Sequence, residues 1–349
     1  MAVGMSGGVD SSAVAALLVD QGYEVIGLTA HMWKEGSRCC SLEDVERARK
    51  VCHALGIKHF VVNAQDRFSE RVVDPFVQEY ASGRTPSPCL HCNQFIKFGF
   101  LLDRARQMDC DFLAMGHYAK VEKRDDGYHL VQPKDARKDQ TYFLSRLNQA
   151  QLAHIIFPLA DMDKAEAKAY LASKNVPVTS RGESQDLCFV EDGKYAEFVE
   201  GKAGDIPTRG DIIDPEGKKL GEHKGIHCYT IGQRGGLGVA AKERLYVSKL
   251  DKGRNEVTLA PRYGIMKDCC LAKEISWISG KPLETGEVVS VRPRYRHPGA
   301  EATLEMIDET TARIRFKEEQ FALTPGQAAV FYRDGEVLGG GWISLDPEG

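Results

Sequence analysis

The chain has 349 residues, of which 42% are hydrophobic and 28% are charged, and its formal net charge is -4 at pH 7. These values are typical of a globular protein of two or three domains, and they exclude a globally basic nucleic-acid binder, so any RNA-binding surface has to be a local patch. No apolar run is long enough to span a bilayer, and the first residues lack a signal-peptide core, which predicts a cytoplasmic protein without a membrane partner.

The first part of the chain alternates short apolar runs with helical periodicity, which is typical of an α/β protein with a Rossmann-like parallel sheet. Strands are expected at 2–5, 24–30, 57–63 and 111–116. Helices are expected at 11–21, 43–55, 65–82 and 93–107. Gly22 and Gly56 follow two of these helices as stops, and Ser41 and Asp44 have the spacing of a capping box.

The composition of the chain changes near residue 200. Residues 201–266 are rich in glycine and carry short alternating runs without a strong helical pattern, which predicts a small, mostly-β domain. Residues 267–349 contain successive strand patterns of the kind that form a compact β-barrel. The sequence therefore predicts an α/β domain at 1–200, a small β-rich domain at 201–266 and a C-terminal β-barrel at 267–349.

The stretch SGGVDSS, residues 6–12, lies between the first expected strand and the first expected helix. Such a turn presents backbone N–H groups and the positive end of a helix, which together bind anions. It has no lysine, unlike a Walker loop, and it lacks the GxGxxG spacing of a dinucleotide fingerprint. Gly7 and Gly8 allow a phosphate to approach the backbone, and Asp10 can hold a magnesium ion or orient the turn. The alternative is a tight turn in which Ser11 caps the helix.

The ten cysteines, in a chain without a secretory signal, predict thiols used for catalysis, metal binding or packing rather than a disulfide framework. Cys89 and Cys92 lie in a proline-stiffened loop before a helix expected to begin near Asn93, where the helix dipole stabilises a thiolate. This pattern indicates a nucleophile, and the alternative is half of a zinc site. Cys188, considered alone, is typical of a buried core cysteine. The other cysteines lie on apolar faces or have no partner pattern, namely Cys39, Cys40, Cys52, Cys110, Cys228, Cys269 and Cys270.

The glycine turn resembles the pyrophosphate loop of the ATP pyrophosphatase (PP-loop) superfamily, whose members adenylate a substrate and release pyrophosphate. Further motifs narrow the choice of reaction. They are GMSGGVDSS, GRTPxPCxxCNxxIKF, MGHYA, KDQTYFL, SQDLCF, GxHKGIHxYTIGQRxGLG and TPGQAAVFY, in this order over nearly the whole chain. On these motifs the chain resembles the tRNA-specific 2-thiouridylase (MnmA) family, which implies an N-terminal domain like that of the adenine nucleotide alpha-hydrolases.

The resemblance implies roles for individual positions. Cys92 matches the nucleophile of the family, and Cys188 matches the cysteine that carries a persulfide. The residues expected to bind ATP are Gly4, Met5, Ser6, Gly7, Gly8, Val9, Asp10 and Ser11 in the turn, with Ala30 and Gly116 beside the adenine. Those expected to contact tRNA are Ser87, Pro88 and Cys89 at the target base, and His117, Lys138, Asp139, Gln140, Arg294, Tyr295 and Gln327 elsewhere.

The implied activity is 2-thiolation of the wobble uridine in tRNAs for lysine, glutamate and glutamine, which requires ATP and Mg²⁺. ATP converts the C2 oxygen into an adenylate, and the Cys188 persulfide then delivers sulfur and leaves a Cys92–Cys188 disulfide. A cysteine desulfurase or a sulfur-relay protein supplies the sulfur. Two positions depart from relatives: Ser87 stands where many have asparagine, and Cys89 stands where some have an aspartate to which proton transfer is sometimes assigned.

Other interpretations fit part of the pattern. A different PP-loop tRNA-modifying ligase would use the glycine turn without needing Cys92 or Cys188. An RNA-binding protein could instead hold a structural metal at Cys89, Cys92 and Cys188. The same three thiols could also hold an iron–sulfur cluster that carries the sulfide. No metal ion bound only by protein ligands is expected.

Overall fold

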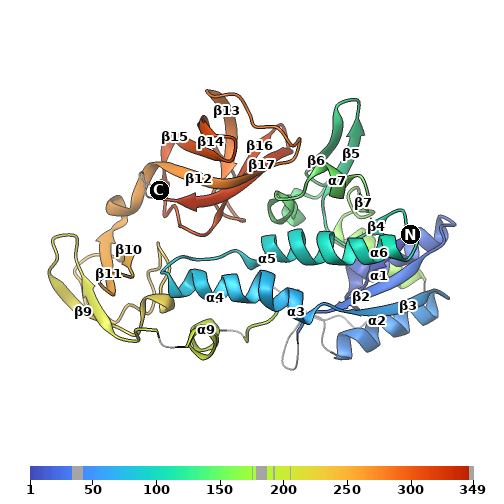
Figure 1. Ribbon diagram of the computed structural model, residues 1–349, viewed down its shortest axis with the longest axis horizontal. Helices are drawn as coiled ribbons and strands as arrows, with labels where there is room; N and C mark the ends of the chain where they lie inside the picture. The colour runs from blue at the N-terminus through green and yellow to red at the C-terminus, as the bar shows by residue number, and fades with distance from the viewer. Residues whose placement is uncertain (34–41, 175, 178–186, 192, 205, 346–349) are drawn as a thin grey trace.

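The N-terminal part of the computed structural model is a parallel sheet of order β3-β2-β1-β4-β7 (Figure 1). The structure describes residues 1–33, 42–174, 176–177, 187–191, 193–204 and 206–345, so Ser41 of the predicted capping box lies outside the described residues. The strands are β1 Ala2–Gly4, β2 Ile26–His31, β3 Lys58–Asn63, β4 Leu113–Ala114 and β7 Ile155–Ile156. Val3 and Leu28 at the centre of the sheet are fully buried. The predicted Rossmann-like α/β fold is confirmed.

Three helices pack on this sheet or on one another beside it. They are α1 Val9–Asp20, α2 Leu42–Ala54 and α8 Lys164–Ser173. α1 contacts β1 and α8, while α2 contacts β2 and β3. Gly22 and Gly56 adopt positive φ angles of 81° and 69° after α1 and α2, as expected of helix stops. None of the described helices is long and apolar enough to span a bilayer.

Two helical rods lead from the sheet to the opposite end of the molecule, and Figure 1 shows them side by side. The first rod comprises α3 Gln65–Phe68, η1 Ser69–Val73 and α4 Asp74–Ala81. The second rod comprises α5 Pro88–His91, η2 Cys92–Leu101 and α6 Leu102–Gln107. Both contain a π-helical stretch, a feature that often marks functional sites because it shifts the side-chain register along the helix.

A small β domain lies at the far end of these rods (Figure 1). Its sheet has the order β10-β11-β8-β9. The strands are β8 Gly210–Ile213, β9 Lys219–His223, β10 Leu245–Asp251 and β11 Glu256–Pro261. Ile212, Val247 and Val257 form its fully buried core. Helix α9 Tyr195–Ala203 and the short 3₁₀ helix η5 Ile226–Cys228 join it to α4.

The C-terminal strands close into a barrel of order β12-β15-β14-β13-β16-β17, since β12 also pairs with β17. The strands are β12 Met266–Trp277, β13 Glu287–Arg292, β14 Ala300–Asp308, β15 Thr311–Phe321, β16 Ala328–Arg333 and β17 Glu336–Ser344. Glycines permit the closure, because a Cβ on Gly339 would lie 2.5 Å from the carbonyl oxygen of Ser276 and one on Gly341 would lie 2.8 Å from that of Lys273. The predicted barrel is therefore confirmed.

The sequence did not indicate that the first domain extends the sheet of the barrel. The hairpin formed by β5 Lys120–Arg124 and β6 Gly127–Val131 pairs with β17 through Val131 and Leu130. Leu130 and Val337 are fully buried in the same apolar cluster that contains the second rod. One side of the barrel and the second rod therefore share an apolar cluster, which fixes their relative orientation.

A buried ion pair reinforces this junction. Arg292 of β13 donates a hydrogen bond of 2.7 Å to Oδ2 of Asp139, which also accepts one of 2.6 Å from Gln132. The other carboxylate oxygen of Asp139 accepts hydrogen bonds from the backbone and hydroxyl of Thr141 at 2.9 and 2.6 Å. Asp139 is only 5% exposed, so its charge depends on these four donors.

We expect Asp139→Ala to lower the free energy of unfolding by about 2 to 4 kcal/mol, because the half-buried guanidinium of Arg292 and the buried groups of Thr141 would lose their acceptor. Thermal unfolding followed by tryptophan fluorescence checks this, with Asp125→Ala at the exposed hairpin tip as the control. A stability equal to that of the control would show that Asp139 does not hold the junction.

Candidate active site

The glycine turn follows β1 at the carboxyl edge of the parallel sheet, where ligands bind in open α/β folds. Gly7 adopts a φ of 71°, and a Cβ there would lie 2.8 Å from Cβ of Arg47 and from the carbonyl oxygen of Asp44. A larger residue would therefore push the turn away from α2. The exposed side chain of Ser6 lies at the outer side of the turn.

Helix α1 begins at Val9, earlier than the predicted start at Ser11. The alternative in which Ser11 caps the helix is wrong, because Gly8 occupies the N-cap and provides no side-chain hydrogen bond. The Ser11 hydroxyl instead accepts a hydrogen bond from the Ser6 backbone at 3.2 Å and donates one to the Gly8 carbonyl at 3.1 Å. The first N–H groups of α1 thus have no side-chain cap, and they can bind an anion.

A lysine reaches the turn from a distant part of the chain. The Nζ of Lys164, the first residue of α8, lies 2.6 Å from both carboxylate oxygens of Asp10. The hydroxyl of Tyr118 donates a further hydrogen bond of 3.1 Å to Asp10. Asp10 therefore holds a lysine ammonium beside the turn, and a role for Asp10 in holding magnesium stays a prediction.

The sequence does not predict that Lys164 contacts the turn. Asp163 and Glu166 form the capping box that starts α8, and their spacing is readable in the sequence, but nothing local connects it with Asp10. The contact exists because α8 packs against α1.

Ala30 and Gly116 lie near the carboxyl ends of β2 and β4, the two strands that flank β1. Ala30 is buried in β2, and Gly116 follows β4. A Cβ on Gly116 would lie 3.0 Å from backbone and side-chain atoms of Asp10 and from the nitrogen of Ser11. Gly116 thus makes room for the start of α1, while its use in an adenine pocket stays a prediction.

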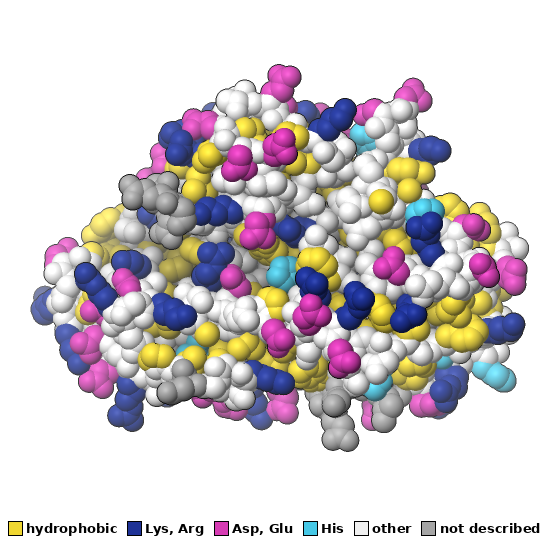
Figure 2. Space-filling view, viewed as in Figure 1, with side chains coloured by type: hydrophobic (Ala, Val, Ile, Leu, Met, Phe, Trp, Pro, Cys, Tyr) yellow, Lys and Arg dark blue, Asp and Glu magenta, His cyan; other side chains and the backbone are white. Residues whose placement is uncertain are grey.

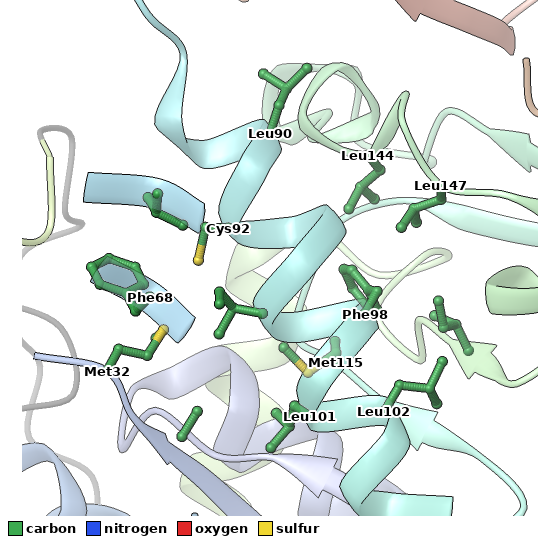
Figure 3. Packing of buried hydrophobic residues seen from close by; sticks show 14 of the residues in the cluster. Met32, Phe68, Leu90, Cys92, Phe98, Leu101, Leu102, Met115, Leu144 and Leu147 are labelled. Carbon is green, nitrogen blue, oxygen red and sulfur yellow. The ribbon is translucent and has the colours of Figure 1, made fainter. Parts of the chain in front are cut away.

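Cys92 lies inside the second rod and not at its start. The helix begins at Pro88 rather than near Asn93, so Cys89 is exposed in the first turn and Cys92 follows one turn later. The helix-dipole argument for Cys92 is therefore wrong. Cys92 is 9% exposed, and Figure 3 shows it on the side of the helix turned toward Phe68 and Met32.

Cys188 borders the same apolar cluster as Cys92. Its neighbour Phe189 anchors this segment, with ring centroids 5.5 Å from Phe68, 5.1 Å from Phe76 and 5.6 Å from Phe198. Cys188 is half-buried, and both cysteines are thiols in the structure. The fold thus brings residues from the second rod and from the Cys188 segment to one group of aromatic side chains around Phe68.

Three polar residues lie together near Cys92, the buried Asn93 and His117 and the half-buried Lys97, and sequence reasoning missed Asn93 and Lys97. The Lys97 ammonium lies 3.4 Å from Nε2 of His117. The Asn93 amide donates a hydrogen bond of 3.0 Å to the carbonyl of Phe143. Within the described part of the chain, Oδ1 of Asn93 and Nδ1 of His117 have no hydrogen-bond partner. Burial, and secondly the charge of Lys97, hold the pKa of His117 well below its ordinary value of 6.5. Only the family motifs around these positions could have indicated them.

Several residues expected to contact tRNA are engaged within the protein. The Gln327 amide donates to the carbonyls of Thr85 and Pro86 at 3.0 and 3.2 Å, which supports the loop before Cys89. Gln140 accepts a hydrogen bond of 2.9 Å from the backbone of Tyr118. His117 and Asp139 are buried. These side chains hold the site together in the structure, and a direct contact with tRNA stays a prediction for them.

The other predicted contacts lie nearer the surface. Arg294 is exposed and donates a hydrogen bond of 3.2 Å to the carbonyl of Phe321. Lys138 is half-buried, and Tyr295 packs on Phe143 with centroids 4.4 Å apart. Figure 2 shows lysine and arginine side chains interspersed with acidic ones on the face in view, as the balanced composition suggests.

A cavity of about 410 Å³ opens between the rods and the barrel. Ser87 and Pro88, both predicted at the target base, line it together with Arg84, His91 and Trp342. Burial lowers the pKa of His91 to about 4, so this ring is neutral at physiological pH. The cavity therefore offers neutral aromatic surfaces beside the segment that carries Cys89.

Comparisons with known proteins cover nearly the whole chain. Residues 1–192 match the family described as tRNA methyl transferase HUP domain, residues 197–261 the tRNA methyl transferase PRC-barrel domain, and residues 267–343 the aminomethyltransferase beta-barrel domain. A tRNA-specific 2-thiouridylase MnmA from Geotalea uraniireducens is 46% identical over 98% of this chain and 94% of its own. The one from Magnetococcus marinus is 45% identical over 98% of both chains.

Among solved structures, the U34-tRNA thiolase NcsA from Methanococcus maripaludis with its [4Fe-4S] cluster is 21% identical, with a TM-score of 0.36. The match covers 57% of this chain and 62% of that one. A likeness of this size supports no inference on the cofactor of the present chain.

The environment of His117 leads to a test by NMR. We expect its ring carbon signals to stay at their neutral positions between about pH 5.5 and 8, because burial and Lys97 both oppose protonation. Selective ¹³C labelling of histidine measures this, and His117→Gln assigns the signal. In Lys97→Met the His117 pKa should rise, since one of the two causes is removed. A titration of His117 near its ordinary pKa in the unaltered chain would contradict the buried, neutral state.

Proposed function

Since this chain belongs to the family of tRNA-specific 2-thiouridylases, we propose that it activates the C2 oxygen of the tRNA wobble uridine with ATP and replaces it with sulfur. One observation carries the proposal: an uncapped helix N-terminus with a lysine beside it lies near a helix that presents a cysteine. Leu101, on the helix of Cys92, lies 3.7 Å from where a Cβ of Gly4 would be. The end of β1 that leads into the glycine turn therefore lies beside the end of the π-helical stretch that begins at Cys92.

The turn fits the triphosphate of ATP. The segment from Gly4 to Ser11 supplies backbone N–H groups and hydroxyls, and Lys164 supplies the positive charge that the segment itself lacks. Ala30 and Gly116 would flank the adenine. We expect Mg²⁺ to arrive bound to the phosphates of ATP, because Lys164 already occupies the oxygens of Asp10. Positive charge here stabilises the charge that moves onto pyrophosphate when the uridine oxygen attacks the α-phosphorus.

The two cysteines supply the sulfur step. The terminal sulfur of a persulfide on Cys188 attacks C2 of the activated uridine and displaces AMP. The thiol of Cys92 then attacks the sulfur of Cys188, which leaves the transferred sulfur on the uridine. The two thiols lose two electrons and form a disulfide, while the sulfane sulfur gains them. A reductant restores the thiols before the next turnover, and a cysteine desulfurase or relay protein reloads Cys188.

The tRNA has to present an unstacked uridine to this site. We place the base beside Ser87, Pro88 and Cys89, whose loop is fixed by the Gln327 hydrogen bonds. Arg294 and Lys138 would contact the phosphate backbone, with Tyr295 nearby. Asp139, Gln140 and His117 would act by positioning these segments. The substrates would be the tRNAs for lysine, glutamate and glutamine, and the reaction would take place in the cytoplasm.

The alternatives from the sequence meet different structural observations. Among the described residues, Cys89, Cys92 and Cys188 do not bring three ligand atoms within 4.8 Å of one another, which argues against a single structural zinc ion there. An amidating ligase would leave Cys92 without a role. An iron–sulfur cluster would use the same thiols, and iron and acid-labile sulfide analysis of anaerobically purified protein distinguishes it from the persulfide route.

Removing the lysine of the turn tests the nucleotide site. We expect Lys164→Ala to lower tRNA-dependent pyrophosphate release about a hundredfold or more, because a charge aimed at the developing anion is lost, and to leave tRNA binding nearly unchanged. Lys168→Ala removes an exposed lysine from the same helix and is the matched control. Equal rates for both variants would remove Lys164 from the reaction.

Serine variants of the two cysteines separate sulfur transfer from the alternatives. Cys188→Ser should still adenylate tRNA but should accept no sulfur, since a hydroxyl cannot carry a sulfane sulfur. Cys92→Ser should accept the sulfur on Cys188 and then stall. Peptide mass spectrometry detects the added sulfur atom after incubation with a donor, and Cys110→Ser is the control for a thiol outside the reaction. Full thiolation by either active-site variant would overturn the two-cysteine mechanism.

A further inference from the structure

A second group of metal-ligating side chains lies far along the chain from the cysteines of the active site. Glu200, His227 and Cys228 place one oxygen, one nitrogen and one sulfur atom within 4.8 Å of one another. Among the described residues this is the one such group of three. No sequence pattern relates Cys228 to Glu200, because Glu200 belongs to α9 whereas His227 and Cys228 belong to η5.

The three side chains are held in fixed surroundings. His227 is 1% exposed, and its Nε2 lies 2.9 Å from Oε1 of Glu200. Gly225, with a φ of 114°, allows the ring to lie against the backbone, since a Cβ there would come within 2.3 Å of the imidazole. Glu200 is exposed, so one side of the group is open to solvent.

The geometry points to a binding site for a zinc-type divalent cation at Glu200, His227 and Cys228. Carboxylate, imidazole and thiolate are the ligands that zinc takes, at about 2.0 to 2.3 Å, which places them about 3.2 to 3.8 Å apart around a tetrahedral ion. All three atoms lie within 4.8 Å of one another, and the 2.9 Å pair of Nε2 and Glu200 Oε1 has to lengthen slightly to admit the ion, for which the exposed Glu200 is available. Three protein ligands leave the fourth position to water.

A bound cation would replace the hydrogen bonds that two members of the group make. The Cys228 thiol donates one of 3.7 Å to the carbonyl of Lys224, and Nε2 of His227 lies 2.9 Å from Oε1 of Glu200. With the cation bound, the thiol proton of Cys228 would be released and Nε2 of His227 would become a ligand.

The position of the site suggests what the cation does. Helix α9 contacts α4, and η5 contacts both α4 and α9, so the cation would bind α9 to the small β domain. Phe198 of the same helix packs on Phe189, which anchors Cys188. The cation would therefore fix the frame on which the Cys188 segment rests, and it would take no part in the chemistry.

Zinc and cobalt binding to the full-length chain test this proposal. The protein is stripped with a chelator, kept reduced, and mixed with zinc or with cobalt. It should retain one equivalent of zinc after desalting, and cobalt should give the charge-transfer absorption of a thiolate ligand. Cys228→Ser should abolish that absorption and, like Glu200→Gln, should weaken zinc binding about tenfold or more. Glu200→Gln alters an exposed side chain, so a loss of zinc in it cannot result from misfolding of the core.

Two controls distinguish this site from the active-site thiols. Cys269→Ser removes an unrelated thiol, and the double variant Cys92→Ser, Cys188→Ser removes both thiols of the proposed reaction. Both should keep the zinc and the cobalt spectrum. The proposal would be overturned if the unaltered chain bound no zinc, if Cys228→Ser retained it, or if only the double variant lost it. This holds whatever the outcome for thiolation.

Discussion

The ion pair between Asp10 and Lys164 determines how the glycine turn can work. The turn has backbone N–H groups but no cation of its own, and a triphosphate carries more charge than the end of one helix neutralises. In the proposed nucleotide site the missing charge comes from Lys164 of α8, so this site requires α8 to pack on α1. Gly116 has to remain without a side chain for the same reason, since a Cβ would meet Asp10. The sheet, its first helix and α8 therefore form one unit.

The sequence predicted the parts of this fold that depend on local patterns. The parallel sheet, the helices that end before Gly22 and Gly56, and the barrel follow from periodicity and turn residues. What it did not predict are contacts between distant segments. No local pattern relates Lys164 to Asp10, and none relates the hairpin of β5 and β6 to β17. The sequence also places the start of the second rod too late. The helix begins at Pro88, because proline is well suited to the first turn of a helix, and not near Asn93.

The candidate site shows the same division. The glycine turn and the two cysteines could be found from motifs, but burial decides what each predicted residue can do. Asp139 and Gln327, both expected at the tRNA, hold the barrel and the loop before Cys89 in place. Their loss would disturb tRNA binding even without a direct contact, because one side of the barrel and the second rod share an apolar cluster. A motif indicates that a side chain is required. It does not show whether that side chain contacts the substrate or positions another residue.

The different exposure of the two cysteines agrees with a division of the sulfur chemistry. In the proposed reaction Cys188 receives sulfur from a second protein and has to be reachable, and it is half-buried on a segment held by Phe189. Cys92 has to meet only Cys188, and its burial beside Phe68 and Met32 keeps other oxidants and thiols away from it. If the roles were exchanged, the buried thiol would have to reach a donor through the aromatic cluster. The fold thus favours Cys188 as the carrier and Cys92 as the thiol that releases the sulfur.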